Sequence, residues 1–323
     1  MDMKTQTKPA NQPYKPLTGE KTWTTKLKES FRRYYWLYIF LLPTLLYYLI
    51  WHYIPMGGII VAFQRYTGAK SILDSDWVGL RWFESFFTSH FAVTTITNTL
   101  MLSLLSMATF PIPIVLALIL NEIRNERYKR FAQTVMYAPH FISMVVLVSM
   151  LTIFFDPNFG FINKIIELFG GEARNFMGES GSFRPLYIWS GVWQSTGWNC
   201  IIYVSALSGV DPSMHEAATL DGASRLQRIL HVNLPTIAPT IIIMLIMRVG
   251  NVMSVGADKV LLMMNELNSS TSEIIGTYVY SRGLLGGDFS YATAVGLFTN
   301  VINLIMLLTV NKISAKVSET SLF

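Results

Sequence analysis

The sequence has little of what soluble proteins use to build and charge a fold. Its 323 residues include a single cysteine, Cys200, so an intrachain disulfide and a cysteine metal site are both excluded. Only 14% of the residues are charged, whereas 51% are hydrophobic. The apolar residues fall in blocks of about twenty or more, which suit a lipid bilayer better than a soluble core.

Catalytic and metal-binding signatures are missing as well. No loop ends in Gly-Lys-Ser or Gly-Lys-Thr, so the chain itself is not expected to hydrolyse ATP. The five histidines lack metal-ligand spacing, and neither HExxH nor GxSxG occurs, so the sequence predicts no enzyme and no metal site. His52 and His140 lie near the ends of apolar blocks, where hydrogen-bonded interfacial histidines are favoured over a proton relay or ligand.

Six apolar blocks predict an all-α, polytopic membrane protein. They run from about Tyr34 to Tyr53 with an extension toward Phe63, Phe91 to Leu120, Phe131 to Phe155, Leu186 to Leu207, Ile237 to Val255, and Tyr291 to Val310. Pro111 and Pro113 fall inside the second block, and Pro139 falls near the start of the third. No cleavable signal is predicted, because the first 33 residues contain no apolar core.

The positive charges predict the orientation of these blocks. The net charge of +5 does not indicate a nucleic-acid partner, because Lys and Arg cluster beside apolar blocks. Sixteen of them lie in segments 1–33, 121–130, 208–236 and 311–323. Eight lie in the intervening segments 64–90, 156–185 and 256–290. Because basic residues favour the cytoplasmic side, both termini are predicted to be cytoplasmic.

This orientation gives a simple domain organisation. Residues 1–33 are predicted to be a partly disordered cytoplasmic tail that ends in an interfacial helix. Residues 34–311 form the membrane domain, and residues 312–323 form a second cytoplasmic tail. Segments 64–90, 156–185 and 256–290 are then outer loops. In the first of them, the aromatic residues between Trp77 and Phe87 predict an amphipathic helix on the outer surface. In the third, a short helix with a glycine-rich exit is predicted after Ile274.

The polar stretch 208–236, between the fourth and fifth blocks, has the most specific pattern. Two capping boxes are predicted, one at Ser213–Glu216 and one at Ser224–Gln227. Asp221-Gly222 between them is typical of a tight turn, since glycine adopts backbone conformations that other residues avoid. Leu234-Pro235 is expected to end the second helix before the chain re-enters the membrane. The stretch therefore predicts two short helices joined by a turn.

Three parts of this stretch together resemble the EAA loop of bacterial ABC importer permeases. They are Glu216-Ala217-Ala218, Asp221-Gly222-Ala223 and Leu234-Pro235. In that family the loop docks into a groove on the cytoplasmic ATPase, so the resemblance implies a coupling role for these residues and for Arg225. It also implies the six-helix fold of type I importer permeases. The chain departs from the family at Ile229, where an aromatic residue is expected. An ordinary amphipathic loop is the alternative.

The rest of the chain resembles the sugar-type permeases that import acidic oligosaccharides. The resemblance is carried by Tyr278-Val279-Tyr280 with Gly283, by residues 287–298, and by the tail 311–323. It is strongest toward the first permease subunit of alginate importers, followed by polygalacturonate and rhamnogalacturonan importers. It implies a complex in the bacterial inner membrane with a second, homologous permease, two ATPase subunits that bind ATP and Mg, and an extracytoplasmic binding protein. No cofactor is implied for this chain.

Polar side chains in two blocks are predicted to line the substrate pathway. They are Trp193, Gln194, Trp198, Asn199 and Tyr203 in the fourth block, and Arg248, Asn251 and Ser254 in the fifth. Indoles suit sugar ring faces and amides suit hydroxyls, although amides that join helices fit the pattern equally well. The three residues of the fifth block are expected to share one helix face. Asn98, Asn300 and Asn303 are predicted to add to the same cavity.

Arg248 has two possible roles, because a charge inside a membrane is costly and needs a partner. It contacts an anionic substrate, or it forms an ion pair with Asp258. Two other classes of protein are weighed against an ABC permease. An ion- or proton-coupled secondary transporter would require buried acids and internal repeats, which are not evident. A membrane-embedded enzyme would require a nucleophile or metal cluster, and none is found.

Cysteine labelling tests the predicted topology. In a Cys200→Ser background, a membrane-impermeant maleimide added from outside should label cysteines introduced near Ser180 and Ser269. A cysteine at Ser224 should stay unlabelled until the membrane is permeabilised, because the charge bias places that loop in the cytoplasm. Labelling of position 224 from outside would contradict the orientation.

Overall fold

The computed structural model describes residues 23–318 and 320–322. Residues 1–22 of the predicted N-terminal tail therefore lie outside the described residues. The chain divides into two compact units, Met1–Gly58 and Ile59–Phe323.

The first unit contains one long helical stretch. It consists of α1 (Trp23–Tyr48), the π-turn η1 (Leu49–Tyr53) and α2 (Ile54–Met56), and the 3-10 helix η2 (Gly57–Phe63) continues past its end. Tyr34 interrupts α1 with non-helical dihedrals (φ −122°, ψ 25°). This break falls where the predicted interfacial helix meets the first predicted span. Residues Glu29–Phe63 are long and apolar enough to cross a membrane.

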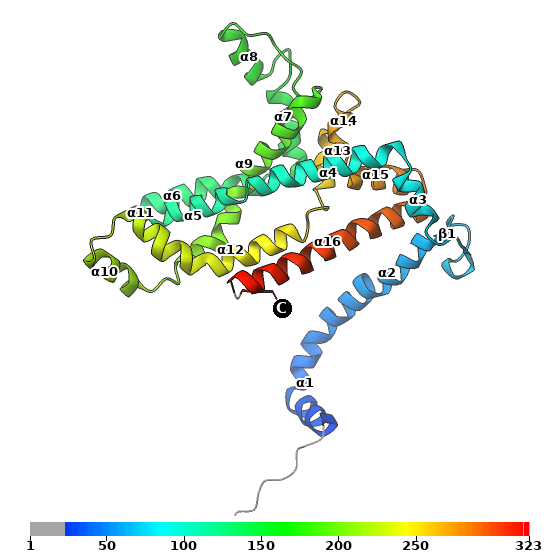
Figure 1. The fold of residues 1–323 in the computed structure, drawn as a ribbon, viewed down its shortest axis with the longest axis horizontal. Helices are drawn as coiled ribbons and strands as arrows, with labels where there is room; N and C mark the ends of the chain where they lie inside the picture. The colour runs from blue at the N-terminus through cyan, green and yellow to red at the C-terminus, as the bar shows by residue number, and fades with distance from the viewer. Residues whose placement is uncertain (1–22, 319, 323) are drawn as a thin grey trace, which may run out of the picture. The chain divides into compact units, whose positions relative to one another are not determined.

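The second unit is almost entirely helical and begins with a small antiparallel ribbon (Figure 1). In the ribbon, β1 (Gln64–Arg65) pairs with β2 (Asp76–Trp77), and η3 (Ile72–Asp74) lies between them. The helices then follow in the order α3 (Arg81–Phe87), α4 (His90–Ala108), α5 (Pro111–Asn121), α6 (Glu126–Tyr137), η4 (Ala138–Phe141), α7 (Met144–Phe154), α8 (Phe161–Leu168), α9 (Ser180–Leu207), α10 (Pro212–Leu220), α11 (Arg225–Arg228), η5 (Ile229–Asn233), α12 (Leu234–Val249), α13 (Ala257–Met263), α14 (Ser269–Ser272), α15 (Ile275–Val279), η6 (Tyr280–Leu285) and α16 (Phe289–Ser318).

Most of the predicted spans appear as long helices. Among the described residues, four helices and one bent pair are long and apolar enough to cross a membrane. The fourth predicted block corresponds to α9, which has 28 residues but is not among these because of its polar side chains. A count of six spans therefore stays a prediction. The last helix, α16, continues to Ser318, beyond the predicted end at Val310 and into the predicted tail.

The third block is not a single straight helix. The stretches Glu126–Phe141 and Met144–Phe154 are bent by 94° at the break between them. Pro139 lies in η4 just before the bend and cannot donate a backbone hydrogen bond. Ser143 then caps α7 by accepting a hydrogen bond from the Val146 amide at 3.3 Å. A proline followed by a new cap thus explains the bend.

In contrast, Leu234-Pro235 does not end a helix, and this prediction was wrong. Residues Arg225–Val249 form one continuous helical stretch through α11, η5 and α12. In the π-turn η5, the Leu234 amide reaches back five residues to the Ile229 carbonyl. The wider turn accommodates Pro235, which has no amide hydrogen to offer. The fifth span therefore begins inside the polar loop.

Two packing contacts position the helices that matter below. The α5 helix packs along α9, burying Leu120 and Cys200 in one apolar cluster. Near the middle of α9, Gly197 lies so close to α6 that an added Cβ would collide with the Met136 carbonyl oxygen. Only glycine permits this close approach.

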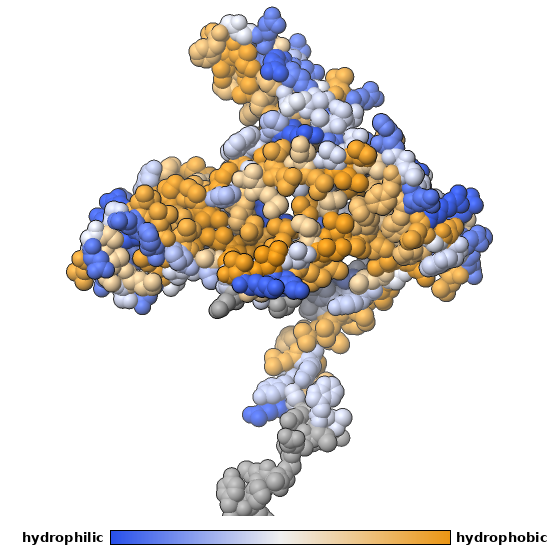
Figure 2. Space-filling view, viewed as in Figure 1, coloured by the Kyte–Doolittle hydropathy of each residue, from blue (hydrophilic) through white to orange (hydrophobic). Residues whose placement is uncertain are grey.

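The amphipathic helix expected on the outer surface is instead anchored by a buried side chain. It corresponds to α3, in which Phe86 is 1% exposed and packs in an aromatic cluster with Tyr278 and Tyr291. The short helix with a glycine-rich exit is confirmed as α15 and η6, followed by Gly286 and by Gly287 at φ +72°. Figure 2 shows hydrophobic residues over the long helices and hydrophilic ones gathered near α10 and α11.

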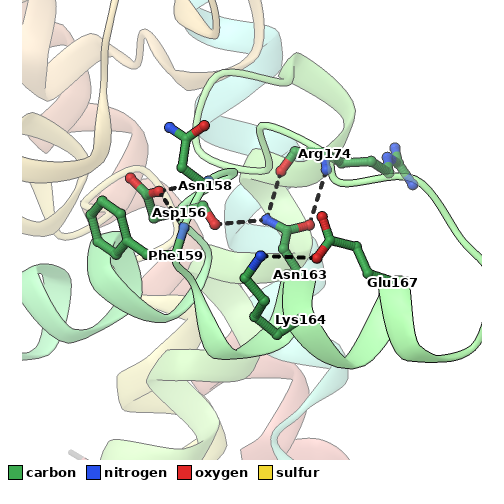
Figure 3. Close-up of polar contacts among 7 residues, drawn as sticks. All are labelled: Asp156, Asn158, Phe159, Asn163, Lys164, Glu167 and Arg174. Carbon is green, nitrogen blue, oxygen red and sulfur yellow. Dashed lines mark hydrogen bonds and ion pairs between the residues drawn. The ribbon is translucent and has the colours of Figure 1, made fainter.

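A small lobe between α7 and α9, residues 156–179, contains α8 and extends from the helical body (Figure 1). Asn163 holds it together (Figure 3). Its side chain is 1% exposed, accepts from the Arg174 amide at 2.9 Å, and donates to the Asp156 and Arg174 carbonyls at 2.9 and 3.0 Å. Arg174 also binds Glu179 through two hydrogen bonds, and these lower the pKa of the Glu179 carboxyl.

Replacing Asn163 should loosen this lobe without affecting the rest of the molecule. Asn163→Leu leaves buried backbone groups unpaired, which costs about 2 kcal/mol. Hydrogen exchange at the Arg174 amide should accelerate about thirtyfold, whereas Asn158→Leu, at an exposed site, should leave it unchanged. Equal exchange in Asn163→Leu and the parent protein would contradict the assigned role.

Candidate functional site

The loop between α9 and α12 begins with a capped helix. Asp211 precedes Pro212, the first residue of α10, and its carboxylate accepts from the Ser213 amide at 2.9 Å. That bond lowers the pKa of Asp211, so the cap is charged at neutral pH. The capping box predicted at Ser213–Glu216 is therefore wrong. Proline is favoured at the first position of a helix, which moves the cap two residues earlier.

The turn after α10 has the predicted geometry. Gly222 adopts φ +74°, a left-handed conformation that glycine tolerates far better than other residues. The Ala223 amide donates to the Ala218 carbonyl at 2.9 Å, and the Gly222 amide donates to the Thr219 carbonyl at 3.1 Å. These two bonds form a Schellman motif, which satisfies the last carbonyls of the helix. An added Cβ at Gly222 would meet no neighbour, so the requirement for glycine is conformational rather than steric.

The second short helix is held to the first. Its predicted capping box is confirmed, because the Ser224 and Gln227 side chains each accept from the other's backbone amide at 3.3 and 2.7 Å. The Arg228 guanidinium donates to the Thr219 hydroxyl at 2.8 Å across the turn. The loop is thus a braced pair of helices rather than a flexible connection.

The surface of this loop is exposed and partly apolar. Among its residues, Leu220 is 89% exposed and Leu226 is 65% exposed. A pocket of about 290 Å³ lies between residues 121–124 and two loop residues, His215 and Arg228. Of the predicted coupling residues, Glu216, Ala217, Asp221, Gly222, Arg225 and Pro235 are exposed, and Ala218, Ala223 and Leu234 are partly buried.

The second predicted site is a set of three cavities that share Arg248. Their volumes are about 250, 200 and 250 Å³. The walls come from α4, the start of α5, the start of α7, α9, α12, α13, and the segment between α12 and α13. No Asp or Glu is found among the described residues that line them. The cavities therefore offer hydroxyls, amides and cations, but no anion.

Arg248 does not form the ion pair with Asp258. Its Nη2 atom donates to the Ser106 carbonyl at 2.6 Å and to the Ser106 hydroxyl at 2.8 Å. Within the described part of the chain, no ion pair involves Arg248, and the Asp258 side chain is exposed. The structural alternative for Arg248 thus involves a neutral partner on α4.

The other two predicted residues of the fifth block, Asn251 and Ser254, line the cavity from a turn and not from a helix. The α12 helix ends at Val249, so Asn251 and Ser254 lie in the following turn and not on a common helix face. Both nevertheless line the same cavity as Arg248. Asn303 holds this turn, since it accepts from the Met253 amide at 2.9 Å and donates to the Ser254 hydroxyl at 2.8 Å.

The α9 residues divide between the cavities and other surroundings. Gln194, Asn199 and Tyr203 line the cavities around Arg248. The two indoles do not line these cavities, and their place on the substrate pathway stays a prediction. Trp193 lines a separate apolar groove with α7 residues, and Trp198 stacks on the His140 ring with centroids 4.3 Å apart. Gln194 also donates to the Ile142 carbonyl at 2.8 Å, so it joins helices as well as lining a cavity.

The three asparagines predicted to extend the cavity are placed elsewhere. Asn98 donates to the Ser270 and Glu273 carbonyls at 3.0 and 2.9 Å, and it accepts from Arg184. Asn303 accepts a hydrogen bond from the Met253 amide in the turn after α12, and Asn300 is exposed. None of them lines the cavities that share Arg248.

Two residues that sequence reasoning missed do line the cavities. Lys259 and Tyr187 contribute from α13 and α9, and Lys259 is 4% exposed. A lysine directly before the apolar run Val260-Leu261-Leu262-Met263 was the available signal.

Comparison with known proteins identifies the family. Residues 109–319 match the family model described as the inner membrane component of binding-protein-dependent transport systems. This chain belongs to that family. As a sugar ABC importer permease subunit it is a transport component and not an enzyme. The mostly helical structure agrees with the permease fold expected from the sequence, and the secondary-transporter alternative is not favoured.

The permease has relatives that match over nearly their whole length. It is 43% identical over 289 residues to the polygalacturonan/rhamnogalacturonan transport system permease protein YteP of Bacillus subtilis (strain 168), covering 89% of this chain and 90% of YteP. Protein LplB of the same strain is 42% identical over 303 residues and 94% of each chain.

Solved structures give the same fold. A chain of a bacterial ABC transporter involved in the import of the acidic polysaccharide alginate matches with a TM-score of 0.84 and 35% identity, over 91% of this chain and 99% of the other. A bacterial alginate ABC transporter in complex with alginate pentasaccharide-bound periplasmic protein matches with a TM-score of 0.85, over 92% and 100%.

Proposed function

We propose that this permease passes an acidic oligosaccharide, of the alginate or pectin type, from an extracytoplasmic binding protein into the cytoplasm. The observation that carries the proposal is the set of cavities around Arg248, to which the described part of the chain contributes cationic and neutral polar groups but no carboxylate. A guanidinium matches a uronate carboxylate through paired hydrogen bonds, and amides match sugar hydroxyls. The relatives named above for polygalacturonan and alginate carry acidic polymers, which supports the same class of substrate.

The contacts of Arg248 suit a site that must release its substrate. The guanidinium already donates to the carbonyl and the hydroxyl of Ser106. A substrate carboxylate would exchange with these contacts rather than meet an unpaired charge, so the net gain on binding is small. Transport requires such modest affinity, because a tightly held substrate leaves slowly.

For the coupling loop, we infer that α10 and α11 dock onto an ATPase subunit on the cytoplasmic side. Support comes from the exposed leucines, since Leu220 and Leu226 present apolar surface that a partner would cover. The Schellman turn and the bond between Arg228 and Thr219 stiffen the loop, so that movement of a docked partner is transmitted rather than absorbed. The proposed coupling residues Glu216, in α10, and Gly222, in the turn after it, are both exposed.

The complete importer then contains further chains. We expect a second permease that differs from this chain but is homologous to it, two ATPase subunits that bind ATP and Mg, and the binding protein. Both termini of this chain lie in the cytoplasm under this proposal. The solved alginate transporter in complex with a periplasmic protein supports a binding protein as the donor of substrate.

Substitutions in the loop test the coupling role. Gly222→Val forces a branched side chain into a left-handed conformation at a cost of about 1–2 kcal/mol. Binding-protein-stimulated ATP hydrolysis by the reconstituted complex should fall about tenfold, and Glu216→Ala should reduce it as well. Glu172→Ala, the same change at an exposed site in the 156–179 lobe, serves as the control. Full stimulation in both loop variants would refute the role.

Arg248→Gln tests the substrate pathway. The change removes charge-assisted hydrogen bonds worth about 1.5–3 kcal/mol, so uptake of an oligogalacturonate into liposomes should fall about tenfold or more. The complex should keep its size on gel filtration, since a neutral amide leaves no unpaired charge in the cavity. If the complex assembles and uptake is unchanged, Arg248 does not bind the substrate. If the complex no longer assembles, the role of Arg248 is structural, through its bond to Ser106.

A further inference from the structure

Lys259 lies in a setting that is unusual for a lysine. It belongs to the first turn of the short helix α13, and its side chain is 4% exposed. It lines the same cavity as Arg248, of about 250 Å³, together with Gln194 and Asn199. Lysines are almost never fully buried without a partner that compensates their charge.

The described surroundings of Lys259 contain no such anion. Its ammonium donates to the Tyr187 carbonyl at 2.7 Å and lies 4.7 Å from the centroid of the Tyr187 ring. No ion pair involving Lys259 is found in the described part of the chain, and the adjacent Asp258 is exposed. A lysine ammonium has three N–H donors, so a carbonyl and a ring face leave it capable of binding an anion.

The neighbouring helix also leaves space at this ammonium. Gly191 on α9 lines the same cavity, and an added Cβ there would lie 3.3 Å from the Lys259 Nζ atom. Glycine therefore keeps the space beside the charge open. The cavity thus holds two cations from different elements, Arg248 from α12 and Lys259 from α13, and none of the described residues on its walls is a carboxylate.

We propose that Lys259 is a specificity-determining residue, which together with Arg248 binds the carboxylates of an acidic oligosaccharide as it crosses this cavity. The inference rests on the proposed function, because the carboxylates that Lys259 and Arg248 would bind belong to the acidic oligosaccharide proposed there. The two groups act differently. The planar guanidinium recognises a carboxylate through paired bonds, whereas the ammonium is a compact point charge that tolerates several orientations of a moving chain.

A purely structural role would not require the charge. Replacing an unpaired buried cation with an apolar side chain of similar length removes a desolvation cost and is often neutral or stabilising. Lys259→Met should therefore assemble normally if the charge serves the substrate. If the bond to the Tyr187 carbonyl instead holds α13 to α9, the same variant should fail to assemble.

The test uses the whole importer in liposomes, with saturating binding protein and tetragalacturonate as the probe. Lys259→Met should lower the maximal uptake rate about tenfold, and Lys259→Arg, which keeps the charge, should restore it to within about threefold of wild type. Asp258→Asn, a change of charge at the adjacent exposed position, should leave the rate unchanged. Gel filtration of each purified complex reports assembly.

Four results would overturn the assignment of Lys259, and one of them also bears on the proposed function. Uptake by an assembled Lys259→Met complex at the wild-type rate would remove Lys259 from the pathway. Lost assembly would assign it to the structural bond with Tyr187. Wild-type importer that carries the carboxyl-reduced tetrasaccharide as fast as tetragalacturonate would overturn the acidic substrate itself, whereas a wild-type preference for the acid that persists in Lys259→Met would overturn only the present inference.

Discussion

Backbone groups that are exposed in a membrane must find partners within the protein, and this constraint organises the second unit. Its helices break at several points, and each break leaves amides or carbonyls unpaired. Side chains from other helices satisfy them: Gln194 binds the Ile142 carbonyl at the 94° bend, Asn303 binds the Met253 amide after α12, and Thr99 binds the Ile275 amide at 3.0 Å. Polar residues that resemble a substrate site in the sequence are therefore partly needed for the fold.

Local chemistry made the loop between α9 and α12 predictable from sequence. A glycine after a helix and a serine three residues before a glutamine each act within one turn, so their geometry needs no tertiary information. The cap of α10 was missed because Ser213 and Asp211 both qualify, and only the preference of Pro212 for the first helical position separates them. The continuous helix past Pro235 was missed because a π-turn leaves no mark in local pattern.

The cavity was less predictable, because helical periodicity gives angles between residues but not the rotation of the helix. Trp193 and Gln194 differ by about 100°, so the same helix directs the amide to the cavity and the indole to an apolar groove. Lys259 was missed for a related reason, since beside Asp258 it has the pattern of a solvated charge pair. Its burial depends on α9, which is far away in sequence and packs over it.

The uninterrupted helix from Arg225 to Val249 has a mechanical consequence. Its 25 residues span about 37 Å and connect the polar loop to the cavity without a loop between them, with the π-turn η5 and Pro239 inside the stretch. A rod of this length displaces its far end by about 0.6 Å for each degree that the near end tilts. A rotation of about 5° would then shift Arg248 by about 3 Å, which is the length of one hydrogen bond. A tilt of this size would therefore break the hydrogen bonds between Arg248 and Ser106.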